Sequence, residues 1–359
     1  MKKSLSFLIS GGGTGGHIFP AIAIGKALQA KYPEANIEYV GAKDKMEMQK
    51  VPEAGFTIHG LWISGIDRKL SLKNLAFPFK LLSSLTRSYF IIKKTKPNAV
   101  IGVGGFASGP LLFMANLLGI PTLIQEQNSY PGITNKLLAK KADRICVAFK
   151  GMDRFFPKEK IVLTGNPIRS QLLETDHTPK QARAFFGLDD QPTVLAIGGS
   201  LGARTLNMAL ETQHNELAQN GVQLLWQTGK FYTKENDVHG KQLTFIKEMD
   251  MAYRAADLVI SRAGASSLSE LSALGKASVL IPSPNVTEDH QTKNAMALVD
   301  EDAAVLVKDK EANTELIPTV LRLMADNNAT HTLGTNILKQ AKPNATSSIV
   351  HEIEKLINQ

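Results

Sequence analysis

The chain has 359 residues, a formal net charge of +8 and a single cysteine. This length suggests about two domains, and 43% hydrophobic with 21% charged residues excludes collagen, coiled coil and global disorder. The one thiol, Cys146, excludes an internal disulfide, a CxxC redox site and a multi-thiolate zinc site. The positive charge favours anionic partners, namely nucleic acid, acidic lipid or phosphorylated small molecules.

The first ten residues place two lysines before an apolar stretch that is too short for a signal peptide, so they predict a strand. No apolar run reaches the ~18–20 residues that span a bilayer. Any membrane association is therefore expected to be peripheral.

Short apolar runs that end in glycine or polar loops alternate with helical segments along the whole chain. This rhythm is typical of βαβ units and a parallel sheet covered on both faces. In the first half the pattern predicts strands at 4–10, 37–40, 99–103, 122–125, 144–147 and 161–163, and helices at 20–31, 43–54, 106–118 and 133–139.

The pattern restarts after Gly165-Asn166-Pro167, with strands predicted at 193–197, 223–227, 258–261, 278–281 and 304–307, and a last helix at 347–358. The predicted fold class is α/β, with two Rossmann-like domains facing a central cleft. We expect domains at 1–165 and 166–340. The helical segment 341–359 is left without an assigned docking site, a return to the first domain being one option.

The first glycine-rich loop runs from Gly11 to His17 between a strand and a helix. Its G-x-G-x-x-G spacing suits a phosphate or sugar that approaches backbone N–H groups at a helix start. The end of the second strand, residues 39–43, lacks the acidic residue that dinucleotide binding requires, which disfavours NAD. Two simpler interpretations stay open: glycines needed only for helix–strand packing, and a His17 side chain turned to solvent rather than a catalytic base.

Two further glycine clusters follow predicted strands. Residues 198–203, like the first loop, form a glycine-rich turn from a strand into a helix, and such a turn suits the diphosphate of a nucleotide. Residues 102–106 lead into an apolar helix, and we interpret them as a turn exposed to the cleft.

A serine-rich turn, residues 261–270, joins another strand to a helix. Ser267 and Glu270 have the S-x-x-E spacing of a capping box. The alternative for Glu270 is a carboxylate that accepts hydrogen bonds from both hydroxyls of a ribose, beside a helix start that faces phosphate. On spacing alone the cap is favoured.

Metal-dependent chemistry finds no support in the sequence. The only D-x-D, Asp300-Glu301-Asp302, has no neighbouring histidine and is interpreted as a solvated charge cluster. The chain also lacks a P-loop and a G-x-S-x-G nucleophile elbow.

The positive charge is concentrated in one stretch, because no Asp or Glu occurs from Arg68 to Gln125. Its first part, 68–96, mixes cations with large apolar residues, a composition that suits an anionic lipid surface. The alternative is an amphipathic helix whose apolar side lies in the core and whose basic side is merely solvated. Nucleic acid is disfavoured because no RNA- or DNA-binding motif accompanies the patch.

Six motifs in this order resemble the MurG family of bacterial glycosyltransferases over nearly the whole chain. They are Gly-Gly-Thr-Gly-Gly-His at 12–17, Gln-Glu-Gln-Asn at 125–128, Gly-Asn-Pro-Ile-Arg at 165–169, Gly-Gly-Ser-Leu-Gly-Ala at 198–203, Ser-Arg-Ala-Gly-Ala at 261–265 and Asp-His-Gln-Thr-Lys-Asn-Ala at 289–295.

The resemblance implies a GT-B fold, with a lipid acceptor on the N-terminal domain and UDP-GlcNAc mainly on the C-terminal one. It places Thr14, Gly15, Gly16, His17, Glu126 and Asn128 around the reacting sugar, Arg169 and Ser200 near the diphosphate, Phe245 and Ile246 around the uracil, Ala265 and Ser266 at the phosphates, Glu270 at the ribose and Gln291 at the donor sugar. Leu201 stands where many members have Gln, and Thr292 stands after Gln291 where some members have a second Gln.

The implied reaction is an inverting transfer of GlcNAc from UDP-GlcNAc to the 4-hydroxyl of MurNAc in lipid I, which forms lipid II for peptidoglycan. His17 is the first choice as general base and Glu126 the second. No cofactor or metal is expected, and the expected partners are UDP-GlcNAc, lipid I and an anionic membrane surface at the cytoplasmic face of the cell membrane. The alternatives are a nucleotide-binding oxidoreductase, a non-catalytic UDP-sugar or lipid-binding module, and a transferase for another glycolipid.

Overall fold

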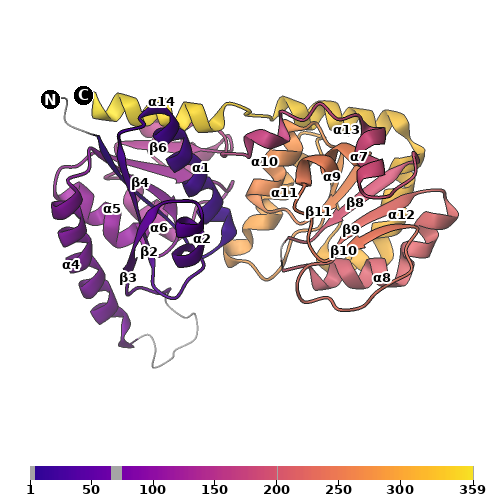
Figure 1. The fold of residues 1–359 in the computed structure, drawn as a ribbon, viewed down its shortest axis with the longest axis horizontal. Helices are drawn as coiled ribbons and strands as arrows, with labels where there is room; N and C mark the ends of the chain where they lie inside the picture. Colours follow the sequence, from indigo (N-terminus) through magenta and orange to yellow (C-terminus); the bar gives the residue numbers. More distant parts are fainter. Residues whose placement is uncertain (1–4, 66–74, 200, 359) are drawn as a thin grey trace. The chain divides into compact units, whose positions relative to one another are not determined.

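The computed structural model describes residues 5–65, 75–199 and 201–358, which form two compact units. The first unit comprises the described residues up to Ile168 and those from Pro343 onward, and the second runs from Arg169 to Lys342. Each unit is built on one parallel sheet with helices packed on its faces (Figure 1). The predicted α/β class, with two parallel-sheet units, is confirmed.

The first sheet has the strand order β3-β2-β1-β4-β5-β6-β7. Its strands are β1 (Ser6–Gly11), β2 (Asn36–Ala42), β3 (Thr57–Leu61), β4 (Ala99–Gly104), β5 (Thr122–Glu126), β6 (Arg144–Val147) and β7 (Ile161–Leu163). One face packs against α1 (Gly15–Lys31), α2 (Glu47–Glu53) and α14 (Ala345–Ile357), and the other against α4 (Phe77–Thr95), α5 (Ser108–Leu117) and α6 (Ile133–Ala139). Because both faces are covered, β1 and β4 are buried along their whole length.

The edge strand β3 was not predicted, and α1 begins five residues earlier than expected. Proline fits the first helical position, so the sequence predicts that the helix begins at Pro20. In the structure Pro20 lies inside α1, and Thr14 is the N-cap in an extended conformation. Because proline has no N–H, the carbonyl oxygen of Gly16 does not receive the helical hydrogen bond from residue 20. The correction places Gly15, Gly16 and His17 within the first turn of the helix.

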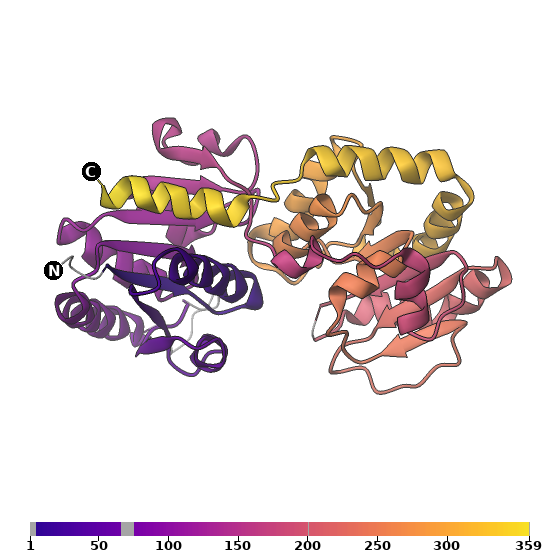
Figure 2. The ribbon, with the colours of Figure 1, turned by 45° about the horizontal axis from the view of Figure 1, so that its top comes forward.

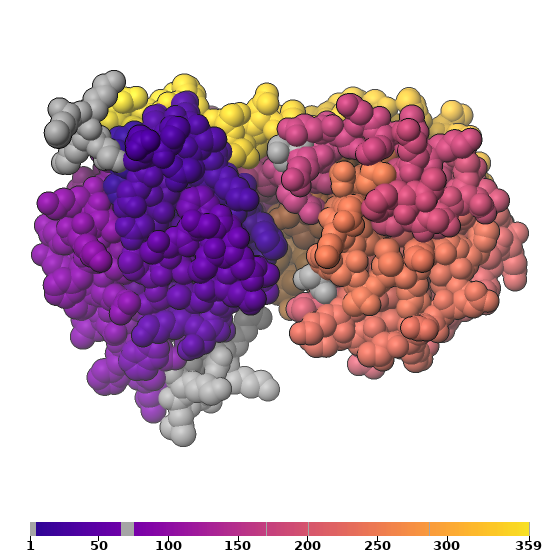
Figure 3. All heavy atoms as spheres, in the orientation of Figure 1, coloured from indigo at the N-terminus to yellow at the C-terminus, as the bar shows by residue number. Residues whose placement is uncertain are grey.

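The C-terminal helix α14 is part of the first unit. Ile349 and Ile353 are fully buried in the core that also contains Phe7 and Leu28. Glu354 accepts hydrogen bonds from Lys31 and from the hydroxyl of Tyr32, each at 2.5 Å, which lowers the pKa of Glu354. Figure 2 shows the yellow helix α14 beside the indigo helix α1, and Figure 3 shows yellow C-terminal atoms against indigo N-terminal ones.

The second sheet has the strand order β10-β9-β8-β11-β12-β13. Its strands are β8 (Thr193–Ile197), β9 (Gln223–Gln227), β10 (Gly240–Leu243), β11 (Leu258–Ser261), β12 (Ser278–Leu280) and β13 (Val305–Leu306), of which β10 was not predicted. The helices are α7 (Pro179–Phe185), α8 (Arg204–Gln219), α9 (Met249–Ala255), α10 (Ala265–Ala273), α11 (His290–Val299), α12 (Ala312–Ala325) and α13 (Asn327–Lys339). Short 3-10 helices lie at Met152–Arg154 and Lys158–Lys160 in the first unit, and at Ser170–Leu172, Thr287–Asp289 and Asp309–Glu311 in the second.

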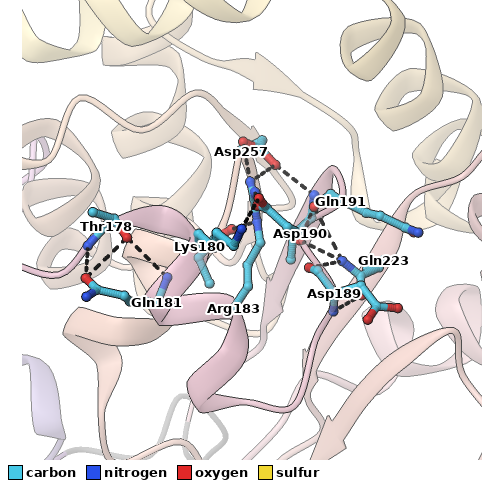
Figure 4. A network of polar contacts seen from close by, with 11 residues as sticks. Thr178, Lys180, Gln181, Arg183, Asp189, Asp190, Gln191, Gln223 and Asp257 are labelled. Carbon is cyan, nitrogen blue, oxygen red and sulfur yellow. Dashed lines mark hydrogen bonds and ion pairs between the residues drawn. The ribbon is translucent and has the colours of Figure 1, made fainter.

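A polar network fixes α7 to the start of the second sheet (Figure 4). Arg183 donates to both carboxylate oxygens of Asp257, at 3.0 and 2.9 Å, and to Asp190 at 2.8 Å. Asp257 in turn accepts the backbone N–H of Thr193 at the start of β8. The side chain of Arg183 is only 12% exposed, whereas those of Asp190 and Asp257 are 49% and 45% exposed, so a mostly buried guanidinium ties the first helix of the unit to carboxylates at the surface.

Helix α4 exposes large apolar side chains while its buried residues are Ser84, Ser88, Ile91 and Ile92. Exposed fractions are 70% for Phe79, 65% for Leu82 and 64% for Phe90. These three side chains line a hollow of about 700 Å³, together with Arg87 and Lys94. The cations Arg68, Lys69 and Lys73 of the basic stretch lie outside the described residues. No helix in the described part of the chain has the length and apolar character to cross a bilayer.

Candidate active site

The strand order of each sheet reverses beside its first strand, since β1 lies between β2 and β4, and β8 lies between β9 and β11. Ligands of open parallel sheets bind outside the carboxyl ends of the strands at such a point. The four segments singled out from the sequence, residues 11–17, 102–106, 198–203 and 261–270, lie at the carboxyl ends of β1, β4, β8 and β11 and in the turns and helix starts that follow them. Each unit therefore brings two of these segments to its own switch point.

His17 lies in the first turn of α1, half-buried, with its ring held by the preceding loop. Nδ1 lies 3.1 Å from the carbonyl oxygen of Gly12 and 3.4 Å from Oγ1 of Thr14. A carbonyl oxygen only accepts hydrogen bonds, so in the neutral ring Nδ1 carries the proton and Nε2 carries the lone pair. This is the tautomer that a base acting through Nε2 requires.

The third glycine cluster makes room for the first loop. Gly104 has φ +103°, and a Cβ there would lie 2.7 Å from Cδ2 and 2.9 Å from Nε2 of His17. A Cβ on Gly105 would lie 2.5 Å from the carbonyl oxygen of Gly12. The cluster is interpreted from the sequence as a turn exposed to the cleft, and its contacts add a second reason for Gly104 and Gly105, which lie against His17 and Gly12.

The start of α1 presents backbone N–H groups without an acidic residue in the first turn. Thr14 is exposed and makes no side-chain cap, so the N–H groups of Gly15 and Gly16 lack the partner that a capping oxygen supplies. Such a helix start attracts the oxygens of an anion or a sugar. Thr14, Gly15, Gly16 and His17 thus converge on one end of the sheet.

Glu126 ends β5 and is 1% exposed. Oε1 accepts the backbone N–H and the side-chain N–H of Asn128, at 3.0 and 3.2 Å. Oε2 accepts the N–H of Gly132 at 3.2 Å and that of the Asn135 amide at 2.8 Å. Burial raises the pKa of this carboxyl, opposed by the same hydrogen bonds. Four donors occupy its four acceptor sites, so Glu126 holds the loop that carries Asn128.

In the second unit, α10 begins at Ala265, with Gly264 as its N-cap. Ala265 and Ser266 occupy the first two helical positions, where N–H groups have no partner within the helix, and the first turn has no acidic residue. Strand β8 lies beside β11, the strand that precedes α10. In the loop after β8, Gly199 and Gly202 have φ of +84° and +82°, which only glycine adopts readily. Ser200 lies outside the described residues.

Glu270 is the sixth residue of α10, and its carboxylate binds two other side chains. Arg169 donates to Oε1 through Nε at 3.1 Å and through a terminal nitrogen at 2.9 Å. Tyr253 donates its hydroxyl to Oε2 at 3.0 Å. Burial and the adjacent Glu270 charge raise the pKa of Tyr253 well above its ordinary value, so this hydroxyl keeps its proton. Two predicted site residues, 101 positions apart, are thus paired.

The capping-box interpretation of Ser267 and Glu270 is wrong. A capping serine must precede the helix, whereas Ser267 is the third residue inside α10. The glycine at 264 takes the N-cap position instead, since it adopts the extended conformation at φ −69° and ψ 137°.

The remaining predicted residues differ in exposure. Phe245 is 55% exposed, whereas the side chain of Ile246 is buried and its N–H donates to Gln227. Gln291 accepts the N–H of Ser283 at 2.8 Å through Oε1. At the two departures, Leu201 is 54% exposed and Thr292 donates to Asp289 at 2.7 Å.

Several buried polar residues lie outside the predicted set of site residues. Gln125 donates to Asn166 at 2.9 Å, and Asn166 donates to the carbonyl oxygen of Gln127 at 3.0 Å, which joins two of the six motifs. Glu47 is 1% exposed and accepts the N–H of Gly13. Its only sequence signal is an acidic residue soon after the second strand, which composition alone does not separate from a solvated one.

No group of three or more His, Cys, Asp or Glu side chains in the described ranges is placed to hold a metal ion. Asp300 and Asp302, the ends of the D-x-D, are exposed.

The sequence matches two family models, the glycosyltransferase family 28 N-terminal domain over residues 7–147 and the family 28 C-terminal domain over residues 193–350. A protein of Christiangramia forsetii, 53% identical over 100% of this chain and 99% of its own, is named UDP-N-acetylglucosamine--N-acetylmuramyl-(pentapeptide) pyrophosphoryl-undecaprenol N-acetylglucosamine transferase. A protein of Cytophaga hutchinsonii with the same name is 52% identical over 99% of this chain and 98% of its own.

Among solved structures, MurG of Acinetobacter baumannii superposes with a TM-score of 0.79 at 30% identity, over 98% of this chain and 100% of that one. The calicheamicin glycosyltransferase CalG4 superposes at 0.72 with 13% identity, over 100% and 99%, and this shows the fold alone.

The two parallel-sheet units with their glycine turns define a glycosyltransferase of the GT-B class. The chain belongs to glycosyltransferase family 28 and, within it, to the MurG family that its motifs resemble. The alternative of a nucleotide-binding oxidoreductase is therefore wrong.

Proposed function

We propose that this chain transfers N-acetylglucosamine from UDP-GlcNAc to the 4-hydroxyl of the N-acetylmuramyl residue of lipid I, an undecaprenyl pyrophosphoryl acceptor, and so forms lipid II for peptidoglycan. The observation that carries the proposal is 53% identity, over the full length, to a relative named for this transfer. Support comes from the described candidate loops, which lie at the two switch points.

We assign UDP to the second unit. The diphosphate lies at the N–H groups of Ala265 and Ser266 and near Ser200, the uracil against Phe245 and the backbone of Ile246, and the donor sugar at Gln291. The helix start and Arg169 hold the negative charge that grows on the leaving diphosphate, without a cofactor or metal.

Donor binding requires Arg169 to leave Glu270. Both acceptor sites of Oε1 are occupied by the guanidinium, and one site of Oε2 is occupied by Tyr253. A ribose that presents two hydroxyls therefore competes with Arg169. If the guanidinium turns to the diphosphate as the ribose binds the carboxylate, both predicted contacts form in one exchange within the second unit.

We assign the acceptor sugar to the start of α1, with His17 as the general base. Nε2 takes the proton of the 4-hydroxyl as that oxygen bonds to the anomeric carbon, and the bond from this carbon to the UDP oxygen breaks. A single displacement inverts the anomeric configuration. Because all four acceptor sites of Glu126 are filled, we assign it to holding Asn128 rather than to proton transfer.

We further propose that α4 holds the protein at the cytoplasmic face of the membrane without crossing it. The exposed Phe79, Leu82 and Phe90 suit the lipid interface, and the neighbouring cations suit acidic headgroups. The interpretation of α4 as an ordinary amphipathic helix places its apolar side in the core, which is difficult to reconcile with these exposed side chains.

The test is transfer of radiolabel from UDP-GlcNAc to lipid I, with diacylglycerol as the competing acceptor. We expect label in lipid I only. Label in diacylglycerol would identify a transferase for another glycolipid, and binding of UDP-GlcNAc without transfer to either would identify a non-catalytic module.

A further inference from the structure

The buried carboxylate of Glu47 has no role in the reaction as proposed above. Glu47 is the first residue of α2, and its side chain lies under the first glycine loop. Oε2 accepts the N–H of Gly13 at 2.9 Å, and Oε1 accepts the N–H of Ala42 at 3.0 Å. Its charged sequence neighbours Lys43, Asp44 and Lys45 are exposed, so the carboxylate is set apart from them. A buried carboxylate is costly unless hydrogen bonds compensate it, and these two do so.

The carboxylate and the imidazole bind opposite ends of one peptide group. The N–H of Gly13 and the carbonyl of Gly12 belong to the same peptide bond, and the carbonyl oxygen lies 3.1 Å from Nδ1 of His17. Resonance links the two ends of a peptide, and hydrogen bonds in a chain polarise one another. A negative charge at the N–H end therefore makes the carbonyl a stronger acceptor for Nδ1–H.

The loop sequence is the one that this arrangement requires. A Cβ on Gly12 would overlap the carboxylate of Glu47, and Gly13 has φ +86°. Gly105 keeps the Gly12 carbonyl accessible, because a Cβ there would lie 2.5 Å from its oxygen. The close approach of the carboxylate thus explains the glycine at position 12, and the positive φ explains the glycine at position 13.

We propose that Glu47 is a positioning residue for His17 and acts through the Gly12–Gly13 peptide. The inference rests on the proposed role of His17 as the base. Glu47 holds the proton on Nδ1 and raises the basicity of Nε2, as a carboxylate does when it binds a histidine directly. Here one peptide group stands between the two.

The test compares Glu47→Gln with the wild type in the full chain, by NMR of 15N-labelled histidine assigned with His17→Asn. Glutamine keeps the size and an acceptor oxygen but removes the charge. We expect the pKa of the His17 imidazole to fall, the proton to spread from Nδ1 to both nitrogens, and the acidic limb of the kcat/KM profile to follow the same pKa. The expected loss in kcat is about 10–100-fold, the size found for outer partners of ligating histidines. UDP affinity stays unchanged.

The matched control is Glu38→Gln, a partly buried carboxylate of the same unit that binds His59 and Asn36. It should leave the His17 resonances and kcat unchanged. A second measurement needs no variant: in the wild type, the amide signal of Gly13 should titrate together with His17. If Glu47→Gln leaves the pKa and tautomer of His17 unchanged, or Gly13 does not follow the titration, the proposal is overturned. A shifted His17 pKa with unchanged kcat supports the relay and rejects His17 as the base.

Discussion

At the scale of single residues, the two candidate bases differ in their hydrogen bonds, and this difference is why we propose His17. His17 has Nδ1 bonded to the loop and its lone pair on Nε2, whereas Glu126 has four donors on its carboxylate. We predict that His17→Ala lowers kcat about 10²–10⁴-fold and leaves UDP affinity nearly intact, as loss of a general base should. Steady-state transfer and calorimetry with UDP measure the two quantities.

Glu126→Gln is the companion variant. It should lower the melting temperature, because an amide nitrogen would face the donors of Gly132 or Asn135. A larger loss of kcat from Glu126→Gln in a protein that melts normally, with little loss from His17→Ala, would reverse the assignment.

Glu270 is expected to contribute more to UDP binding than to folding. We predict that Glu270→Ala weakens UDP binding by about 1.5–3 kcal/mol, the range for hydrogen bonds to a charged group. Calorimetry measures this, and a thermal melt measures the cost to folding. Tyr253→Phe is the matched variant, since it removes one hydrogen bond to the same carboxylate and should leave UDP affinity close to that of the wild type. A lowered melting temperature with unchanged UDP affinity in Glu270→Ala would make the carboxylate purely structural.

The exchange at Glu270 has a separate consequence for Arg169→Ala. Without the guanidinium, Oε1 is open to a ribose, so uridine should bind more tightly than to the wild type. UDP should bind more weakly, because the diphosphate loses its cation. Calorimetry with both ligands tests the crossover, and a parallel decrease in both affinities would show that Arg169 does not compete with the ribose.

The glycine loops pointed to the two helix starts, because sites for phosphate and sugar use backbone N–H groups that glycine-rich turns leave accessible. The roles proposed for Arg169, Glu126 and Glu270 come from the family resemblance. Partner choice was not predictable. The pairing of Arg169 with Glu270 joins positions 101 residues apart, and the bonds of Glu126 depend on how its loop closes. The hydrogen bond from Gly13 to Glu47 likewise depends on the register of β1 beside β2.

At the scale of elements, α4 is expected to bind anionic membranes. We predict that Arg87→Glu, Lys93→Glu and Lys94→Glu together release the protein from anionic vesicles, since each cation contributes roughly 1 kcal/mol near an acidic surface. Flotation at low and high salt measures binding. Trp62 is 48% exposed, and its ring centroid lies 5.9 Å from Nζ of Lys80. Its fluorescence emission should shift when the protein binds vesicles, whereas that of the fully buried Trp226 should not.

The control for α4 changes Lys230, Lys241 and Lys339 to Glu, three exposed lysines of the second unit. It alters the net charge by the same amount. Equal flotation of the two variants and the wild type would show that α4 is only a solvated face.

Helix α14 is expected to stabilise the first unit. We predict that Ile353→Ala costs about 2–5 kcal/mol, the range for truncating a buried isoleucine. Hydrogen exchange should accelerate in β1 and α1 and stay unchanged in β8. Leu338→Ala, on the half-exposed side of α13, should change stability by less than about 0.5 kcal/mol. Unchanged exchange in β1 would mean that α14 does not hold this unit.

Helix ends were less predictable than helices. Pro20 and Ser267 both carry signals for a helix start, yet both lie inside helices because Thr14 and Gly264 take the extended conformation one position before the first turn. The composition of α4 suggested exposed apolar residues. Which of its residues are buried depends on its packing against α5 and β3, which the sequence does not show.

At the scale of the whole molecule, the repeated βαβ pattern predicts two parallel sheets, because buried central strands have continuous apolar runs. The edge strands β3 and β10 were missed, since their sequences mix polar and apolar residues as exposed edges do. The docking of α14 joins this C-terminal helix to β1 and α1, and no local pattern encodes such a contact.

The central claim is an inverting transfer to the acceptor sugar, and the most direct measurement follows the anomeric carbon itself. UDP-GlcNAc labelled with 13C at C1 of the sugar is incubated with the protein and lipid I, and the product is identified by NMR. The account predicts one disaccharide in which the labelled carbon is bonded to O4 of MurNAc with β configuration, opposite to the α configuration of the donor. Label bonded to O4 with α configuration, or label recovered only as free GlcNAc or unreacted donor, would contradict it.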